Sequence, residues 1–110
     1  MGTHCDVYFE TEKGGFIGTY CHYDGYPDHM IPQLTSMGYS EVAATILVAI
    51  PKGGMRYIDR EDGTEYLESG GIELLTNPNE DWASQFVYIK RLNGQVEYRL
   101  SEEKEWKTAS

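Results

Sequence analysis

Alternating apolar and polar residues predict two β-hairpins, one near each end of the chain. Residues 4–10 (HCDVYFE) and 16–23 (FIGTYCHY) are rich in strand-forming residues, and the glycines between them supply a turn. Residues 86–101 (FVYIKRLNGQVEYRLS) contain Asn93-Gly94, the pair that most favours a two-residue hairpin turn. We therefore expect two antiparallel strand pairs that contribute to one sheet.

A two-residue turn at Asn93-Gly94 also predicts the pairing of the C-terminal hairpin. It places Ile89 opposite Tyr98 and gathers the apolar side chains on one face. The predicted core face consists of Val87, Ile89, Val96, Tyr98 and Leu100. The predicted exposed face carries two favourable pairs, Lys90 with Glu97 and Tyr88 with Arg99.

Helical spacing follows the first hairpin. Met30, Leu34 and Met37 recur at helical intervals, with Pro32 acceptable only in a first turn and Gly38 as a stop. Ser40 is a suitable N-cap for a second helix, EVAATILVAI, which Pro51 and the Gly53-Gly54 pair end. Because this second segment is apolar on nearly every side, we expect it to be buried across the sheet.

The remaining segments are shorter. MRYI and TEYLE predict two short strands around the turn REDG, and a loop is expected at Asn77-Pro78. The charged tail, about residues 102–110, is expected either to fray, to swap or to be anchored by Trp106. We predict a single α+β domain over residues 1–110, with an antiparallel sheet built from the two hairpins and one or two helices packed on one face.

Charge narrows the possible partners. The chain has 110 residues and a formal net charge of -9, so most of its surface repels a nucleic-acid backbone. We expect no direct nucleic-acid binding and no membrane association, since the longest apolar run is too short to span a bilayer. Nothing at the N-terminus resembles a signal peptide, which favours the cytoplasm, with Cys5 and Cys21 as free thiols.

Two sets of side chains invite a metal or catalytic interpretation. His4, Cys5, Cys21 and His22 alternate along paired strands, so two histidines or two cysteines can share a face, but four ligands do not converge. A second set, His22, Asp24, Asp28 and His29, could hold a divalent metal or form an acid–base pair. Alternatively, Asp24 bonds the backbone of the turn and His22 holds it. With no nucleophile and orienting group, we predict no catalytic residues, no metal site, no cofactor and no enzymatic activity.

The stretch YCHYDGYP, residues 20–27, also fits a ligand site. Tyr20, His22, Tyr23 and Tyr26 offer flat faces with polar edges, on which planar rings stack. Gly25 would let a ligand approach the backbone, and Asp24 would bond to ring or ribose edges. Arg56 or Arg60 would meet a phosphate.

Acidic clusters suggest a different partner. The carboxylates gather in two places: Asp59, Glu61, Asp62, Glu65 and Glu68, and then Glu102, Glu103 and Glu105. Such surfaces can imitate nucleic-acid phosphates and occupy a basic groove of another protein. The alternative is a solvated charged loop that keeps the domain soluble.

The opening MGT and the segment Tyr20-Cys21-His22-Tyr23-Asp24-Gly25-Tyr26-Pro27 resemble a largely uncharacterised family of small phage and bacterial proteins. Its members commonly begin MGTR and carry a Y-x-H-W-D-G-Y-P-like segment. This sequence departs from the pattern with His4 in place of arginine and Tyr23 where tryptophan is frequent. The resemblance covers about the first third of the chain and implies a phage or prophage setting, without assigned functional residues.

Together these observations predict a non-enzymatic phage accessory protein that acts against host defence. It would sequester a small nucleotide-like immune signal in an aromatic pocket, as a homo-oligomer in the host bacterial cytoplasm. The first alternative is an acidic nucleic-acid mimic that inhibits a basic host defence protein. The second alternative is a metal-dependent nucleotide hydrolase.

Overall fold

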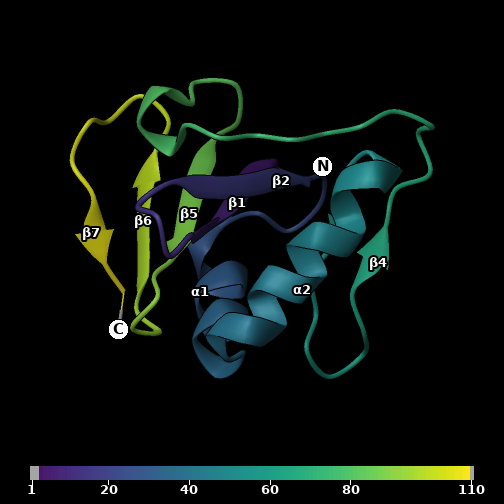
Figure 1. Cartoon of the computed structure of the whole chain (residues 1–110), viewed down its shortest axis with the longest axis horizontal. Coiled ribbons are helices and arrows are strands. Elements are labelled where there is room, and N and C mark those ends of the chain that lie inside the picture. Colours follow the sequence, from purple (N-terminus) through teal and green to yellow (C-terminus); the bar gives the residue numbers. More distant parts are fainter. Residues whose placement is uncertain (1–2, 110) are drawn as a thin grey trace.

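The fold is α+β, with a mixed sheet and two α-helices (Figure 1). A computed structural model describes residues 3–109. The strands are β1 (Cys5–Glu10), β2 (Phe16–Cys21), β3 (Met55–Tyr57), β4 (Glu65–Tyr66), β5 (Phe86–Lys90), β6 (Val96–Leu100) and β7 (Lys107–Thr108). The helices are α1 (Pro27–Ser36) and α2 (Tyr39–Ala49), with the 3₁₀ turns η1 (Ile50–Lys52) and η2 (Pro78–Glu80).

Within the described residues, the strands form one seven-stranded sheet in the order β4-β3-β2-β1-β5-β6-β7. The pairs β1–β2 and β5–β6 are antiparallel, whereas β1–β5 and β2–β3 are parallel. The prediction of a purely antiparallel sheet is therefore wrong. A hairpin can be predicted because its two strands are neighbours in sequence. The parallel pair β1–β5 joins segments about 80 positions apart, and the alternation of residues within each strand does not indicate which distant strand it pairs with.

The helices cover one face of the sheet and form the larger core with it. Val42, Ile46 and Ala49 of α2 are fully buried, and Met30 and Leu34 anchor α1. The outer side of α2 is exposed at Leu47, Val48 and Ala44, so the expected burial of this helix across the sheet holds for one of its sides. The sheet contacts one side of α2, and nothing else in the described chain covers the other.

The helix starts also differ from the expected ones. α1 begins at Pro27, which leaves Pro32 inside the helix instead of in its first turn. α1 ends at Ser36 with Met37 as its C-cap, so the stop predicted at Gly38 is confirmed. α2 begins at Tyr39 with Gly38 as its N-cap, so the cap predicted at Ser40 is wrong. Both helices are therefore longer at their N-termini than the apolar spacing indicates.

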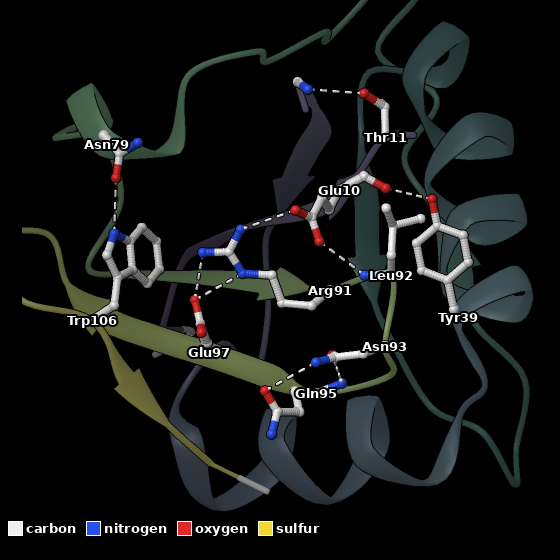
Figure 2. A network of polar contacts seen from close by, with 11 residues as sticks. Glu10, Thr11, Tyr39, Asn79, Arg91, Leu92, Asn93, Gln95, Glu97 and Trp106 are labelled. Carbon is white, nitrogen blue, oxygen red and sulfur yellow. Dashed lines mark hydrogen bonds and ion pairs between the residues drawn. The ribbon is translucent and has the colours of Figure 1, made fainter. Parts of the chain in front are cut away.

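The C-terminal hairpin has a longer turn than predicted. Tyr88 pairs with Tyr98 and Val87 with Arg99, one position away from the expected register. The amide of Arg91 donates to Gln95 O, and Glu10 accepts bonds from Arg91 and from the amide of Leu92 (Figure 2). These contacts close a loop of three residues, 92–94, with Gly94 at φ +91°.

The register change overturns the predicted faces of this hairpin. Tyr88, Lys90 and Arg99, which we expected to be exposed, are almost completely buried. The Nζ of Lys90 donates to Leu34 O at 2.7 Å, near the C-terminal end of α1, where helix carbonyls lack intrahelical partners. Tyr88 and Lys90 lie on the helix-covered face, whereas Arg99 lies on the opposite face and bonds Pro78 and Asp81. All three assignments fail because both faces of this hairpin are covered.

A chain segment covers the second face of the sheet. Residues 75–84, which we call the strap, follow a bridge between Gly18 and Leu75 and run on the side away from the helices (Figure 1). Beneath it lies a smaller apolar cluster of Tyr8, Val87 and Ile89. In the tail, β7 pairs with β6, and Trp106 donates to Asn79 at 2.9 Å (Figure 2). Met1, Gly2 and Ser110 lie outside the described residues.

In residues 3–109, no single helix is long and apolar enough to cross a membrane. Residues 27–36 and 39–52 reach that length and apolar content only when they are counted together, and the chain bends by 117° between them.

Candidate functional site

Strand alternation separates the cysteines from the histidines. Cys5 and Cys21 lie directly opposite each other on the helix-covered face, and both are fully buried free thiols. Burial, with a hydrogen bond to Cys21, raises the pKa of the Cys5 thiol well above its ordinary value. His4 and His22 precede and follow these positions and stack on the other face, with ring centroids 4.8 Å apart. The expectation that four ligands do not converge agrees with this geometry.

Tyr20 connects the two histidines. Its hydroxyl lies 2.9 Å from His4 Nδ1 and 2.7 Å from His22 Nδ1. His4 Nδ1 is also 2.8 Å from the carbonyl oxygen of His22, which can only accept, so His4 Nδ1 carries a hydrogen. The Tyr20 hydroxyl therefore donates to His22 Nδ1, which leaves the hydrogen of that ring on Nε2. Burial, followed by the nearby Asp6, raises the pKa of Tyr20.

The turn after β2 exposes two further tyrosines. The Tyr23 and Tyr26 side chains are 39% and 41% exposed, and Tyr23 meets His22 edge to face at 4.4 Å between ring centroids. Asp24 is exposed and has φ +56°, a left-handed conformation that aspartate tolerates. His22 bonds Tyr20, and the predicted contact in which His22 holds Asp24 does not form among the described side-chain bonds.

Gly25 does not serve as an opening for a ligand. It is buried, its amide donates to Thr3 O at 2.7 Å, and its carbonyl accepts from the Tyr88 hydroxyl at 2.7 Å. A Cβ at this position would lie 2.8 Å from the Cβ of Cys5. The glycine allows the turn to pass close to the start of β1, so its predicted role toward a ligand is wrong.

The two candidate phosphate-binding arginines lie in different places. Arg56 follows Met55, which pairs with Cys21, and its carbonyl accepts from the Tyr23 amide at 2.8 Å. Alternation therefore places the exposed Arg56 side chain on the same face as His22.

Arg60 lies instead on the helical side. Its amide donates to Gln33 Oε1 at 2.8 Å, and its side chain pairs with Glu41 at 3.7 Å, beside an open cavity of about 600 Å³. The structure thus brings together Tyr20, His22, Tyr23 and Arg56, and it does not bring Arg60 to them.

His29 and Asp28 do not join this group. His29 Nε2 lies 2.7 Å from Ile58 O, which connects α1 to the chain after β3. Among residues 3–109, no group of three or more histidine, cysteine, aspartate or glutamate side chains could hold a metal ion. The metal-dependent alternative therefore has no candidate centre in this part of the chain.

Sequence reasoning missed a buried polar network under the strap. Asp6, on β1, and Asp81, in the strap, are 2% and 7% exposed, and the Tyr8 hydroxyl donates to Asp81 Oδ2 at 2.6 Å. Arg99 lies between the rings of Trp82 and Trp106, at 4.8 and 5.1 Å from their centroids. The sequence offered one sign of this network, the acidic Asp6 within the otherwise apolar strand CDVYFE. Its partner Asp81 is too distant in sequence to be inferred from that sign.

Comparison with known proteins yields no match to a family model, to a curated protein or to a solved structure.

Proposed function

We propose that this protein binds a small, planar, anionic ligand of nucleotide type on the surface formed by Tyr20, His22, Tyr23 and Arg56, the aromatic face. The observation that carries the proposal is the Tyr20 hydroxyl, which bonds Nδ1 of both His4 and His22 and holds their stacked rings in place. A rigid aromatic surface loses little side-chain entropy when a flat ligand stacks on it.

The chemistry of this surface favours such a ligand. The Nε2–H of His22 is a donor at the ring edge, and Tyr23 presents a partly exposed ring beside it. Arg56 adds a cation, and within the described residues no carboxylate forms an ion pair with it. A guanidinium without a carboxylate partner is suited to a phosphate group.

Binding alone would suffice for the proposed role. The aromatic face contains no nucleophile paired with a base, so we propose sequestration without turnover. The further proposal, that a phage or prophage uses this sequestration against a host immune signal, rests on the sequence resemblance alone.

Titration calorimetry of mono-, di- and cyclic nucleotides against the purified protein tests this function. We expect one class to bind, and Tyr23→Ala to weaken it roughly 5- to 150-fold, the equivalent of about 1–3 kcal/mol for one stacked ring. Arg56→Gln should weaken binding of the same nucleotide about tenfold.

Arg60→Gln is the matched control, because Arg60 is also exposed but lies beside Glu41 and Gln33. It should leave the affinity unchanged. Absence of binding by every nucleotide, or equal losses in Arg56→Gln and Arg60→Gln, would contradict a site on the aromatic face.

A second candidate function has its own observation. Asp59 Oδ1 accepts bonds from the amides of Glu61 and Asp62 at 2.8 and 2.9 Å and fixes a tight loop between β3 and β4. The exposed carboxylates on this loop and on β4 are Glu61, Asp62 and Glu65. A fixed row of carboxylates supports the alternative proposal, an acidic mimic that binds a basic defence protein.

A further inference from the structure

The strap is held to the sheet largely by polar contacts. Its first residue, Leu75, exchanges backbone bonds with Gly18 at 2.8 and 2.9 Å. Farther along, Arg99 of β6 donates to the carbonyls of Pro78 and Asp81. Between these two attachments, the only apolar cluster of the described residues on this face is small, with Tyr8, Val87 and Ile89 at its centre.

A pair of carboxyl groups lies at the middle of this contact. Asp6 projects from the central strand β1 on the same face as Tyr8, which bonds Asp81, so its carboxyl lies beneath the strap close to Asp81 and Ser84. The Tyr8 hydroxyl donates to Asp81 Oδ2, and the amide of Ala83 donates to Asp81 Oδ1 at 3.3 Å. Both residues are more than nine-tenths buried.

Two buried carboxylates in contact cannot both remain ionised without a large free-energy cost. Burial, and then the hydrogen bond and charge of Asp81, raise the pKa of Asp6 from 3.8 to about 8. Ser84 opposes this shift and Glu73 adds to it.

The other ionisable groups that face the pair do not supply a cation to Asp6. On this face they are His4 and Tyr8 of β1, Tyr20 and His22 beside them, Arg99 of β6, and Glu73 just before the strap, while Cys5 lies on the opposite face of β1. The guanidinium of Arg99 interacts with Asp81, and both histidines bond Tyr20. A proton is therefore the simplest neutralising group for Asp6.

We propose that one proton shared between Asp6 and Asp81 holds the strap on the sheet, so that the strap loosens as the pH rises toward mildly alkaline values. The proton is bound in the closed strap and is lost when the strap opens and water reaches Asp6. This device lies beneath the strap, with Asp6 paired to Tyr20 of the aromatic face, and the proposal does not rest on the proposed function.

The direction of the effect follows from proton linkage. Because the closed form keeps its proton up to about pH 8 and the open form releases it near 3.8, closure is strongest at acidic pH. Each rise of one pH unit between these values favours opening by at most about tenfold. Above the higher value both forms are ionised, and the opening equilibrium no longer depends on this proton.

Native-state amide hydrogen exchange on the full chain tests the proposal. After correction for the intrinsic exchange rate, the opening constants of Leu75 and Ala83 should rise by up to about tenfold per unit between pH 5.5 and 7.5 and level off above pH 8.5. The amide of Val42, in α2 on the other side of the sheet, should change much less. Equal changes at all three amides would indicate global unfolding and would overturn the proposal.

Asp6→Asn is the decisive variant, since an amide can still donate to Asp81 and accept from Ser84 but does not titrate in this range. Its strap amides should lose the pH dependence. Glu80→Gln, on the exposed side of the strap, is the control and should retain it. If Asp6→Asn does not fold, carboxyl carbon NMR of the wild-type protein decides: titration of Asp6 below about pH 5 overturns the proposal.

Discussion

Gly25 shows how a single residue can be required by a segment that is distant in sequence. Its amide bonds Thr3, its carbonyl bonds Tyr88, and the start of β1 leaves no space for a side chain. A Cβ would lie 2.7 Å from Thr3 O and 2.9 Å from the backbone nitrogen of Cys5. Because both neighbours are backbone atoms, and Cys5 belongs to the paired strand β1, they cannot move aside at low cost.

We therefore expect Gly25→Ala to lower the free energy of unfolding by about 1–3 kcal/mol, or more if β1 is displaced. Urea denaturation followed by tryptophan fluorescence measures the change. Gly71→Ala is a suitable control, because Gly71 is exposed and its nearest neighbour would be 4.0 Å from the new Cβ. A Gly25→Ala protein as stable as the Gly71→Ala protein would show that the turn does not need the close approach.

At the level of elements, the turn of the C-terminal hairpin decides which side chains of β5 and β6 share a face. A loop of residues 92–94 replaces the expected two-residue turn, and Glu10 of β1 stabilises it through Arg91 and Leu92 (Figure 2). Arg91 also bonds Glu97 at 2.7 Å. Contacts from another strand thus favour one turn length over the other, and with it the pairing of Tyr88 with Tyr98 and of Lys90 with Val96.

Gly94 is the residue on which this turn length depends, because φ is +91° there. Gly94→Ala meets no atom within 4 Å, so its cost is the backbone strain alone, about 1 kcal/mol. Thermal and urea unfolding should show this loss. Gly15→Ala in the other hairpin, where no positive φ is required, should cost less, and equal costs would contradict this account of the turn.

At the level of the whole molecule, a net charge of -9 is spread unevenly. The helix-covered core is apolar, the loop after β3 is acidic, and Arg56 is placed on the same side as the histidines. The outer side of α2 is apolar and exposed at Leu47 and Val48. Association into a homo-oligomer stays a prediction, which light scattering of the purified chain would measure.

Salt dependence distinguishes the two proposed functions. If the acidic loop binds a basic partner, its affinity for a lysine- and arginine-rich test peptide should fall steeply between about 50 and 300 mM salt. Over this range the Debye length shortens below about 10 Å, so salt screens the attraction between exposed charges. The double variant Glu61→Gln and Asp62→Asn should reduce both the affinity and its salt dependence, as measured by fluorescence anisotropy. Binding that persists in this variant would exclude the loop as the contact.

Much of the local structure could be predicted from the sequence. The alternation in residues 4–10 and 16–23 predicts β1 and β2, which are slightly shorter, and the two short strands around REDG occur as β3 and β4. The separation of Cys5 and Cys21 from His4 and His22 also follows from alternation alone. These features depend on neighbours in sequence, and a period of two reports them directly.

Only the tertiary structure decided the mixed sheet, the turn at residues 92–94 and the roles of Gly25, Lys90 and Arg99. It also placed Arg56 beside His22 and Arg60 beside Glu41, and it brought Asp6 against Asp81. Each of these features depends on contacts between segments far apart in the chain. The preference of a residue for helix or strand carries no information about the free energy of such contacts. The sequence by itself therefore determined where the main strands and helices lie along the chain, and the packing of those elements determined their ends and which polar side chains meet.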